Sequence, residues 1–484
     1  MKHYPVAIVG AGPAGLTAAY ELVKEGIIPV VLEKGDKVGG IARTETYKGY
    51  RFDIGGHRFY TKVEAVQQLW QEVLGNEFIK VPRLSRIFYR GKFFNYPISA
   101  FNTLFNLGII ESTLIILSYL KVRIWPLREE KTFEEWVINR FGERLYKTFF
   151  KTYTEKVWGI PCSEIQADWA AQRIKGLSLT TAIINALFGS NDTKTLIKEF
   201  DYPALGPGMM WEKFAEAVEN KDGKVYLDTK VISLDREGNI IKSITAEHNG
   251  ELVQYSADNF ITSMPISALV ARMKPQPPEE VLHAARSLKY RDFLIVSLII
   301  DRKDLFPDNW IYIHSPEVKV GRIQNFKNWS AALVPDASKS CLGMEYFCSV
   351  GDDIWEMSDA ELVELATREL VDLGLATTAE VEDGVVIRQL KAYPVYDGEY
   401  RGHLQVLEGF LKGIENLQTI GRNGMHRYNN QDHSMLTGIL AVRNILGEKH
   451  DLWDVNTERS YYEDFSVDRR SKEKNDSSLI SQSS

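Results

Sequence analysis

The first 60 residues combine short apolar runs with one helical period. Residues 6–9, "VAIV", form a continuous apolar run of the kind found in strands that are buried on both faces. A second run, residues 28–33, has the same character. Between the two runs, apolar residues recur every three or four positions, at Leu16, Ala19, Tyr20 and Val23. This pattern predicts a strand, a helix and a second strand, as at the start of a parallel α/β sheet.

The rest of the chain supplies further strands and helices. Residues 224–265 alternate apolar and polar positions around the turn sequences "REGN" and "HNGE", which predicts a strand, a hairpin and a strand. Residues 285–400 contain "RDFLIVSLII" and "NWIYIH", typical of an antiparallel sheet. Residues 80–200 carry amphipathic runs such as "FEEWVINRFGERLYKTFFKTY" and are predicted to be mainly helical. Residues 417–446 predict a last short strand, a glycine loop and a helix.

A chain of 484 residues exceeds what a single hydrophobic core normally holds, so several domains are expected. We predict an α/β fold in which a Rossmann-like domain is interleaved with a helical domain and an antiparallel-sheet domain. The predicted divisions are 1–80, 201–280 and 401–462 for the Rossmann-like domain, 81–200 for the helical domain, 281–400 for the sheet domain and 463–484 for a disordered polar tail.

Composition places the chain among ordinary globular proteins, with 44% hydrophobic and 25% charged residues. The net charge is -7 and no basic stripe is present, which argues against a nucleic-acid partner. The three cysteines, Cys162, Cys341 and Cys348, lack metal-type spacing and fit a reducing compartment. The N-terminus passes directly into a strand without a signal-peptide pattern, so a cytoplasmic protein is expected.

Residues 93–125 form a strongly apolar stretch. Pro97 and Glu111 interrupt it, and the remaining pieces are shorter than the ~20 residues that a membrane-spanning helix needs. The sequence therefore predicts buried helices in this stretch, with contact to a membrane surface as the less favoured alternative.

The glycines after the first strand have the spacing of a dinucleotide-binding loop. Gly10 permits a tight turn, Gly12 lets the backbone approach a pyrophosphate, and Gly15 lets the helix pack closely on the strand. Glu33 ends the second strand, where a carboxylate holds ribose hydroxyls and disfavours a 2′-phosphate. A purely structural turn is improbable, because the motif follows a strand and opens a helix.

A second glycine pair, Gly39 and Gly40, is followed by Arg43 and favours FAD over NAD as the dinucleotide. This extended arrangement resembles the start of the superfamily of amine oxidases, phytoene desaturases and protoporphyrinogen oxidases. In "FDIGGHRFYT", Gly55 and Gly56 would let bare backbone lie against an isoalloxazine ring, with His57 at its edge. The predicted cofactor-binding residues are Gly10, Gly12, Ala14, Gly15, Glu33, Lys34, Gly40, Arg43, Gly56, His57, Val231, Met264, Gly421, Asp432 and Ser434.

Four later segments are similar, in order, to UDP-galactopyranose mutases, especially those of the eukaryotic type. They are "YTEKVWGIPCSEIQADWAAQR" at 153–173, "GRIQNFKNWS" at 321–330, "AYPVYDGEY" at 392–400 and "GRNGMHRYNNQDHS" at 421–434. Many superfamily members have Gly-Asp or Gly-Glu at the start of the last segment, where this chain has Gly421-Arg422. A guanidinium there indicates that an anion binds nearby.

The resemblance implies a nucleoside-diphosphate sugar as substrate and a change of its ring form without net oxidation. It also implies FAD that acts in the reduced state, with NAD(P)H as a candidate reductant. The catalytic residues implied are His57, Arg322 and Arg422. The implied substrate-binding residues are Phe149, Tyr153, Trp158, Arg173, Tyr393 and Tyr428.

Two departures and two alternatives stay open at the level of sequence. The segment "RFYTK" after His57 differs from the mutases. The mutases place an asparagine that reads uracil after the tyrosine matching Tyr153, whereas this chain has Thr154. The main alternative is an FAD-dependent oxidase or desaturase acting on an apolar or amine substrate, with residues 93–125 lining a tunnel. Against it, an apolar substrate would leave the arginines unpaired. A redox sensor or scaffold is the third possibility, and no residue pattern favours it.

Overall fold

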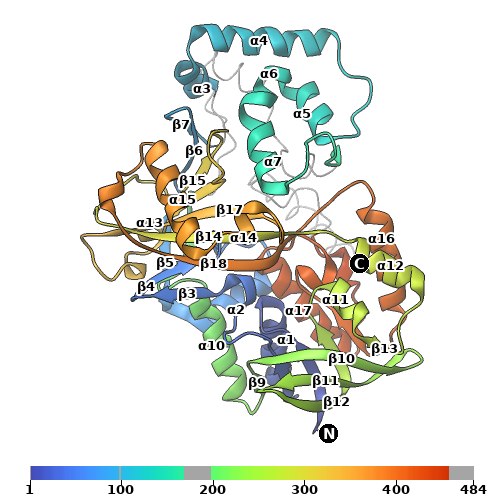
Figure 1. Ribbon diagram of the computed structural model, residues 1–484. Coiled ribbons are helices and arrows are strands. Elements are labelled where there is room, and N and C mark those ends of the chain that lie inside the picture. Colours follow the sequence, from blue (N-terminus) through green and yellow to red (C-terminus); the bar gives the residue numbers. More distant parts are fainter. Residues whose placement is uncertain (1, 97–99, 168–197, 457–484) are drawn as a thin grey trace, which may run out of the picture.

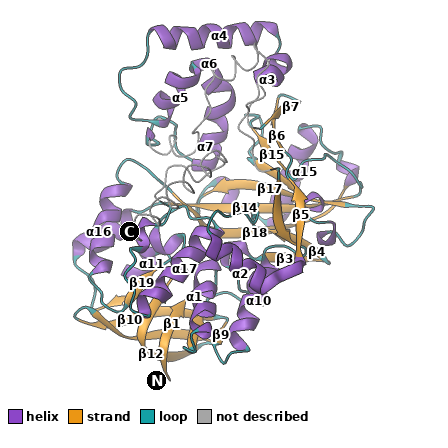
Figure 2. Ribbon diagram, turned by 180° about the vertical axis from the view of Figure 1, so that it is seen from behind, coloured by secondary structure: helices purple, strands orange, loops and turns teal. Residues whose placement is uncertain are grey.

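The computed structural model describes residues 2–96, 100–167 and 198–456. Two large sheets and a group of helices follow one another along the molecule (Figure 1). The first sheet lies at the end that carries the N-terminus, and the second sheet occupies the middle. The helices from α3 (Ala100–Leu107) to α7 (Thr152–Trp158) lie at the far end. Figure 2 shows the same order from behind.

The first sheet has eight strands and β1 (Lys2–Val9) near its centre. β1 pairs in parallel with β2 (Pro29–Leu32) on one side and with β12 (Glu251–Thr262) on the other. Parallel pairing continues to β9 (Lys224–Tyr226) and β19 (Leu417–Thr419). The antiparallel strands β10 (Thr229–Glu237) and β11 (Ile240–His248), with the short β13 (Met273–Lys274), complete the sheet.

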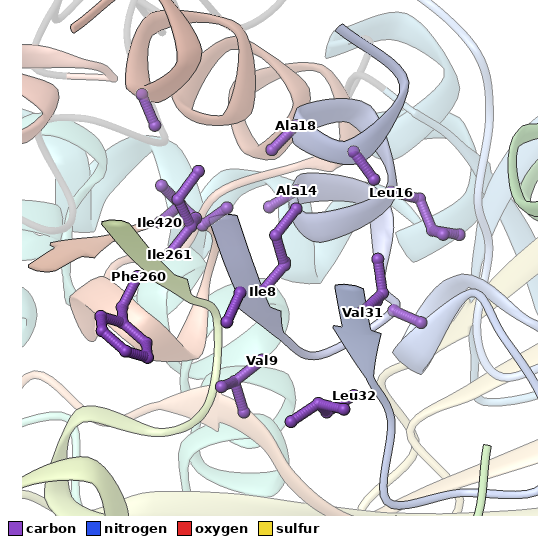
Figure 3. Close-up of a cluster of buried hydrophobic side chains, with 14 of the residues drawn as sticks. Ile8, Val9, Ala14, Leu16, Ala18, Val31, Leu32, Phe260, Ile261 and Ile420 are labelled. Carbon is purple, nitrogen blue, oxygen red and sulfur yellow. The ribbon is translucent and has the colours of Figure 1, made fainter. Parts of the chain in front are cut away.

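Helices α1 (Pro13–Lys24) and α17 (Gln431–Ile445) pack together beside this sheet. A Cβ atom on Gly438 of α17 would lie 2.5 Å from the carbonyl oxygen of Ala14, so a glycine is required where the two backbones meet. Figure 3 shows the hydrophobic core between the first sheet and these helices, where Ile8, Val31 and Ile261 of the strands lie near Ala14 and Ala18 of α1. The other helices of this part are α2 (Glu64–Leu74), α10 (Gly208–Glu219), α11 (Ile266–Ala271), α12 (Glu279–Ser287) and α16 (Tyr400–Lys412).

The second sheet has seven strands and is antiparallel except where β15 pairs with β6. Its order is β18 (Val381–Pro394), β14 (Tyr290–Ile300), β17 (Ser340–Cys348), β16 (Arg322–Asn325), β15 (Trp310–Ile313), β6 (Ser85–Tyr89) and β7 (Lys92–Asn95). Its helices are α13 (Phe326–Trp329), α14 (Asp353–Glu356) and α15 (Asp359–Asp372). Two small two-stranded antiparallel sheets, β3 (Thr44–Tyr47) with β4 (Tyr50–Asp53) and β5 (Phe78–Pro82) with β8 (Glu199–Pro203), complete this part.

The far end consists of α3 (Ala100–Leu107), α4 (Ile109–Ile124), α5 (Phe133–Phe141), the short α6 (Glu143–Leu145), a π-helical stretch (Tyr146–Lys151) and α7 (Thr152–Trp158). The Thr132 side chain and Glu135 form a reciprocal capping box that fixes the start of α5. The π-helical stretch runs directly into α7, the helix that carries Tyr153.

The prediction of buried helices for residues 93–125 is wrong for α4. Only the stripe made by Ser112, Ile115, Tyr119 and Val122 is buried. These positions are three or four residues apart, so they share the inner side of the helix, which packs on α5 and α6. The opposite side of α4 is exposed. Within the described ranges, no helix is both long and apolar enough to cross a membrane.

The contact between α1 and the preceding turn gives a stability prediction. A Cβ atom on Gly15 would lie 1.9 Å from the carbonyl oxygen of Gly10, so Gly15→Ala should destabilise the protein by about 1–3 kcal/mol and lower its FAD content. Gly409→Ala is the matched control, because Gly409 lies inside α16 with open space around its Cα. That variant should be more stable by about 0.5–1 kcal/mol. Urea denaturation and flavin absorbance measure both effects, and equal behaviour of the two variants would contradict the prediction.

Candidate active site

The first glycine loop joins β1 to α1 and is held in a conformation that only glycine adopts easily. Gly10 has a φ of +102° and donates its N–H to the Leu32 carbonyl at 2.9 Å. The residue that caps α1, Gly12, offers no side chain to the first turn of the helix. The backbone N–H groups of that turn are therefore available to an anion, with the positive end of the helix dipole behind them.

A second glycine loop lies against the first. The Gly39 N–H donates to the Ala11 carbonyl at 2.8 Å, and a Cβ atom on Gly40 would lie 3.3 Å from the Gly12 Cα. Arg43 fastens this loop, because its Nη1 donates to the Gly40 carbonyl at 2.8 Å. Two stretches of bare backbone thus meet at the carboxyl edge of the sheet, where a pyrophosphate can approach both.

A carboxylate stands beside the loops at the end of β2. Glu33 accepts hydrogen bonds from the Ala11 N–H at 2.7 Å and from the Gly35 N–H at 2.9 Å. These bonds fix the carboxylate where the ribose of a dinucleotide would lie. The next side chain, Lys34, is exposed to solvent.

The C-terminal segment closes the same region. Gly421 has a φ of +79°, and a Cβ atom on it would lie 3.1 Å from that of Ala14. Asp432 and Ser434 are buried in the first turn of α17. On the side of the antiparallel strands, Val231 is buried and its carbonyl accepts from Arg272 Nε at 3.1 Å. Met264 follows the end of β12, beside β1. These loops, helix ends and one carboxylate could hold the pyrophosphate and a ribose of a dinucleotide.

The second sheet contacts the "GGH" segment that follows β4. Gly55 has a φ of +91°, and a Cβ atom on it would lie 3.5 Å from Arg322 Nη2. A Cβ atom on the exposed Gly56 would lie 3.1 Å from Gln324 Nε2 and 3.2 Å from the Trp329 ring. Bare backbone is required here because side chains of β16 and α13 already press against one side of it.

Arg322 is held by a buried carboxylate. Its Nε donates to Glu345 Oε2 at 2.5 Å, and the Glu345 side chain is 0% exposed. Gln324 Nε2 donates to the other carboxylate oxygen at 2.8 Å. Burial opposes the charge on Arg322, but Glu345 outweighs it and holds the pKa of the guanidinium well above its usual value.

Arg422 has partners of another kind. Its Nε donates to the Asn429 carbonyl at 2.9 Å and its Nη1 to the Ala392 carbonyl at 3.1 Å. The guanidinium lies 4.6 Å from the ring centre of Tyr428 and 5.8 Å from that of Tyr393. In the described part of the chain Arg422 forms no ion pair, so its positive charge has no carboxylate to balance it.

Three tyrosines surround the two arginines. The rings of Tyr393 and Tyr428 stack at 5.7 Å with an interplanar angle of 14°. Tyr153 lies edge-on to Tyr312 at 5.5 Å and stacks on His314 at 4.9 Å. Burial raises the pKa of Tyr153 and of Tyr393 above the usual value, so both remain neutral phenols that can donate a hydrogen bond.

The chain matches the family model described as flavin containing amine oxidoreductase over residues 13–446, which is most of its length. The chain belongs to this family. Its members are flavin-dependent enzymes, and a flavin is therefore the expected cofactor of this chain as well.

Several relatives of this flavoenzyme are known. It is 30% identical over 177 residues to a "Probable UDP-galactopyranose mutase" of Klebsiella pneumoniae, an alignment that covers 34% of the chain and 44% of that relative. Its fold matches a crystal structure of reduced UDP-galactopyranose mutase with a TM-score of 0.82 at 22% identity, covering 94% of this chain and 98% of that one. A putrescine oxidase bound to putrescine matches with a TM-score of 0.60 at 18% identity, covering 92% and 99% of the two chains.

The flavoenzyme brings together most of the residues that its sequence singles out. His57, Arg322, Arg422, Tyr153, Tyr393 and Tyr428 converge where the two sheets meet. Phe149 and Trp158 are buried in the core of the helical part, where Phe149 packs on Phe94. Arg173 lies outside the described residues.

Sequence reasoning missed four residues that support this cluster. Glu345 and Gln324 hold Arg322, and His314 stacks on Tyr153. Lys156 Nζ donates to the carbonyls of Ser315 at 2.7 Å and Val320 at 3.1 Å, which ties α7 to the segment that leads into Arg322. A signal existed for Glu345, because it is a lone carboxylate within the apolar run "CLGMEYFC". A buried carboxylate in such a strand requires a partner.

His57 is the titratable group beside the "GG" backbone. Its Nε2 lies 2.9 Å from the Ile54 carbonyl. Burial, with Arg422 as the second cause, lowers the pKa of His57 from 6.5 to about 4. The imidazole is therefore neutral at pH 7. Its contribution to stability is present above pH 6.5 and is lost as the pH falls through about 4.

This environment predicts how the imidazole titrates. We expect the His57 ring of the flavin-free protein to titrate near pH 4, and Arg422→Gln should move the midpoint upward because one positive neighbour is removed. Arg427→Gln is the control, since Arg427 binds the carbonyls of Trp453 and Val455 in the same region. NMR of 15N-labelled histidines follows the titration. A midpoint near 6.5, or equal shifts in both variants, would contradict this assignment.

Proposed function

We propose that this flavoenzyme uses reduced FAD to change the ring form of a nucleoside-diphosphate sugar. The observation that supports this most is the meeting of two guanidiniums beside the Gly55–His57 backbone. One of them, Arg422, has only carbonyl and aromatic partners among the described residues. Such a charge, half-buried and unbalanced, favours an anionic ligand.

The cradle residues would each have a definite role toward FAD. The first turn of α1 and Gly39–Gly40 would receive the pyrophosphate, Glu33 the ribose hydroxyls, and the start of α17 the flavin end of the cofactor. Bound there, reduced FAD would supply the nucleophile for the anomeric carbon of the sugar. NAD(P)H would be the source of the reducing electrons.

The residues around the sugar phosphates would stabilise the departing diphosphate. Arg322 is oriented through its Nε by Glu345, which leaves its two terminal nitrogens to bind phosphate oxygens. Arg422 would bind the same group with its full charge. The neutral phenol of Tyr393 and the hydroxyl group of Tyr428 would add hydrogen bonds. Preorganised donors of this kind lower the barrier, because they need no rearrangement as negative charge develops.

The neutral state of His57 fits the same reaction. A protonated imidazole would be a third positive charge beside Arg322 and Arg422. Burial, and after it the charges of these two arginines, lower the pKa of His57 to about 4. With the ring neutral, His57 orients the edge of the flavin site, and the arginines provide the positive field. That field also favours negative charge on the reduced flavin.

An FAD-dependent oxidase remains the second candidate, because the fold also matches that of a putrescine oxidase. The electrostatics disfavour an amine substrate. A protonated amine would enter a site where one guanidinium already lies 4.6 Å from the Tyr428 ring and the two tyrosine rings are stacked. A protonated amine about 4 Å from that guanidinium would be repelled by about 1 kcal/mol or more.

The test uses UDP-galactopyranose as the probe. Dithionite-reduced protein should convert it into the furanose form, detected by chromatography, whereas oxygen-dependent release of hydrogen peroxide without isomerisation would support the oxidase instead. Arg422→Gln should weaken nucleotide-sugar binding by about 10–100-fold, because a charge-assisted contact is lost, and should keep its FAD. Arg427→Gln should retain the affinity. Flavin fluorescence reports binding, and unchanged affinity in Arg422→Gln would remove Arg422 from the substrate site.

A further inference from the structure

The outer side of the α3–α4 region exposes many large apolar side chains. We call this surface the α4 apolar face, and it consists of Phe105, Ile109, Ile110, Leu117, Leu120, Ile124, Trp125 and Leu127. Their exposed fractions lie between 43% for Leu127 and 88% for Phe105. A contiguous apolar surface of this kind usually marks a binding surface.

Among the described residues, the position of α4 leaves this face accessible to an extended planar surface. α4 lies across the end of the molecule opposite the N-terminus, and it is the outermost helix in both Figure 1 and Figure 2. Its buried stripe points inward, so Ile110, Leu117, Leu120 and Ile124 occupy the other side of the helix. A plane could therefore touch α4 along its length without meeting the sheets.

The charged residues around the α4 apolar face help to decide whether an anionic bilayer or a second copy of the chain covers it. Lys121 and Arg123 lie in the last turn of α4, and Arg128 follows shortly after. All three are exposed, and none forms an ion pair within the residues that the structure describes, in a chain whose net charge is -7. The acidic Glu111 on the same helix is already bound to Arg144 at 2.6 Å. The charge left over beside the apolar face is therefore positive.

This charge favours an anionic bilayer over a second copy of the chain. A two-fold contact places the same patch of each copy against itself, which would bring the unpaired cations of the two copies toward one another. Phospholipid headgroups with negative charge would instead neutralise them. Trp125, which is 73% exposed at the end of α4, is the residue type that settles at the boundary between headgroups and acyl chains.

We propose that the α4 apolar face binds the surface of a bilayer that contains anionic phospholipids. With 16 residues α4 is too short to span the hydrocarbon layer, but it can lie in the plane of the interface with its apolar side buried. Lys121, Arg123 and Arg128 would contact the headgroups. This inference is independent of the reaction that the flavin site performs.

Vesicle flotation of the full-length, FAD-loaded protein tests the proposal. The protein should float with phosphatidylcholine vesicles containing 30% phosphatidylglycerol, and flotation should decrease with pure phosphatidylcholine or in 0.5 M salt, as expected for an interaction with about three cations. Leu117→Asp with Leu120→Asp should reduce flotation by at least about 10-fold. Lys121→Gln with Arg123→Gln should abolish the preference for the anionic vesicles.

The control variant is Leu252→Asp, because Leu252 is 67% exposed on β12 of the first sheet, at the other end of the molecule. It should float like the unmodified protein, and flavin absorbance should show that every variant retains its cofactor. Absence of flotation, or equal flotation of the Leu117 and Leu120 double variant, would overturn the proposal. So would a dimer, seen by light scattering, that the same double variant converts into a monomer while no vesicles are bound.

Discussion

The ion pair between Arg322 and Glu345 is the interaction on which the site depends. Glu345 is completely buried, and a buried carboxylate without partners would cost several kcal/mol. Arg322 Nε donates to one carboxylate oxygen of Glu345, and Gln324 Nε2 donates to the other. Gln324 Oε1 accepts a hydrogen bond from Trp329 Nε1 at 3.1 Å. The network joins β16, β17 and α13 and sets the surface against which the Gly55–Gly56 backbone lies.

The two arginines of the site differ because their partners differ. Glu345 fixes Arg322 and balances its charge. Arg322 therefore contributes geometry and two terminal nitrogens that have no hydrogen-bond partner among the described residues. Arg422 is bound through carbonyls and aromatic rings, so it contributes net positive charge. Burial, with the charge of Arg422 as the second cause, lowers the pKa of His57 and keeps its imidazole neutral. A site built this way is suited to an anionic ligand beside a flavin and poorly suited to a cationic one.

The α4 apolar face and the active site both depart from the usual pattern, in which apolar groups are buried and charged groups are exposed. In the site, charged groups are partly removed from water and must find partners, either within the protein or in a ligand. On α4, apolar side chains are exposed to water, and a surface that covered them would remove that exposure. These two departures from the ordinary arrangement are the basis on which we propose an anionic ligand at the site and a bilayer at α4.

Local sequence determined much of the scaffold. The glycine spacing from Gly10 to Gly15, Glu33 at the end of a strand, and the apolar runs of β14 and β15 are each patterns within a few consecutive residues, so they are readable along the chain. The segments that contribute Arg322 and Arg422 were identified by resemblance and not by periodicity.

What only the tertiary structure decided concerns pairs of residues that are distant in sequence. No sequence pattern predicts that Lys156 binds the segment leading into Arg322, or that His314 stacks on the ring of Tyr153. Both contacts depend on how the helical part packs on the second sheet. The apolar residues of α4 likewise predict burial, since composition records what a side chain prefers and not which surface covers it. Residue preferences are local, whereas partners are assigned by the fold.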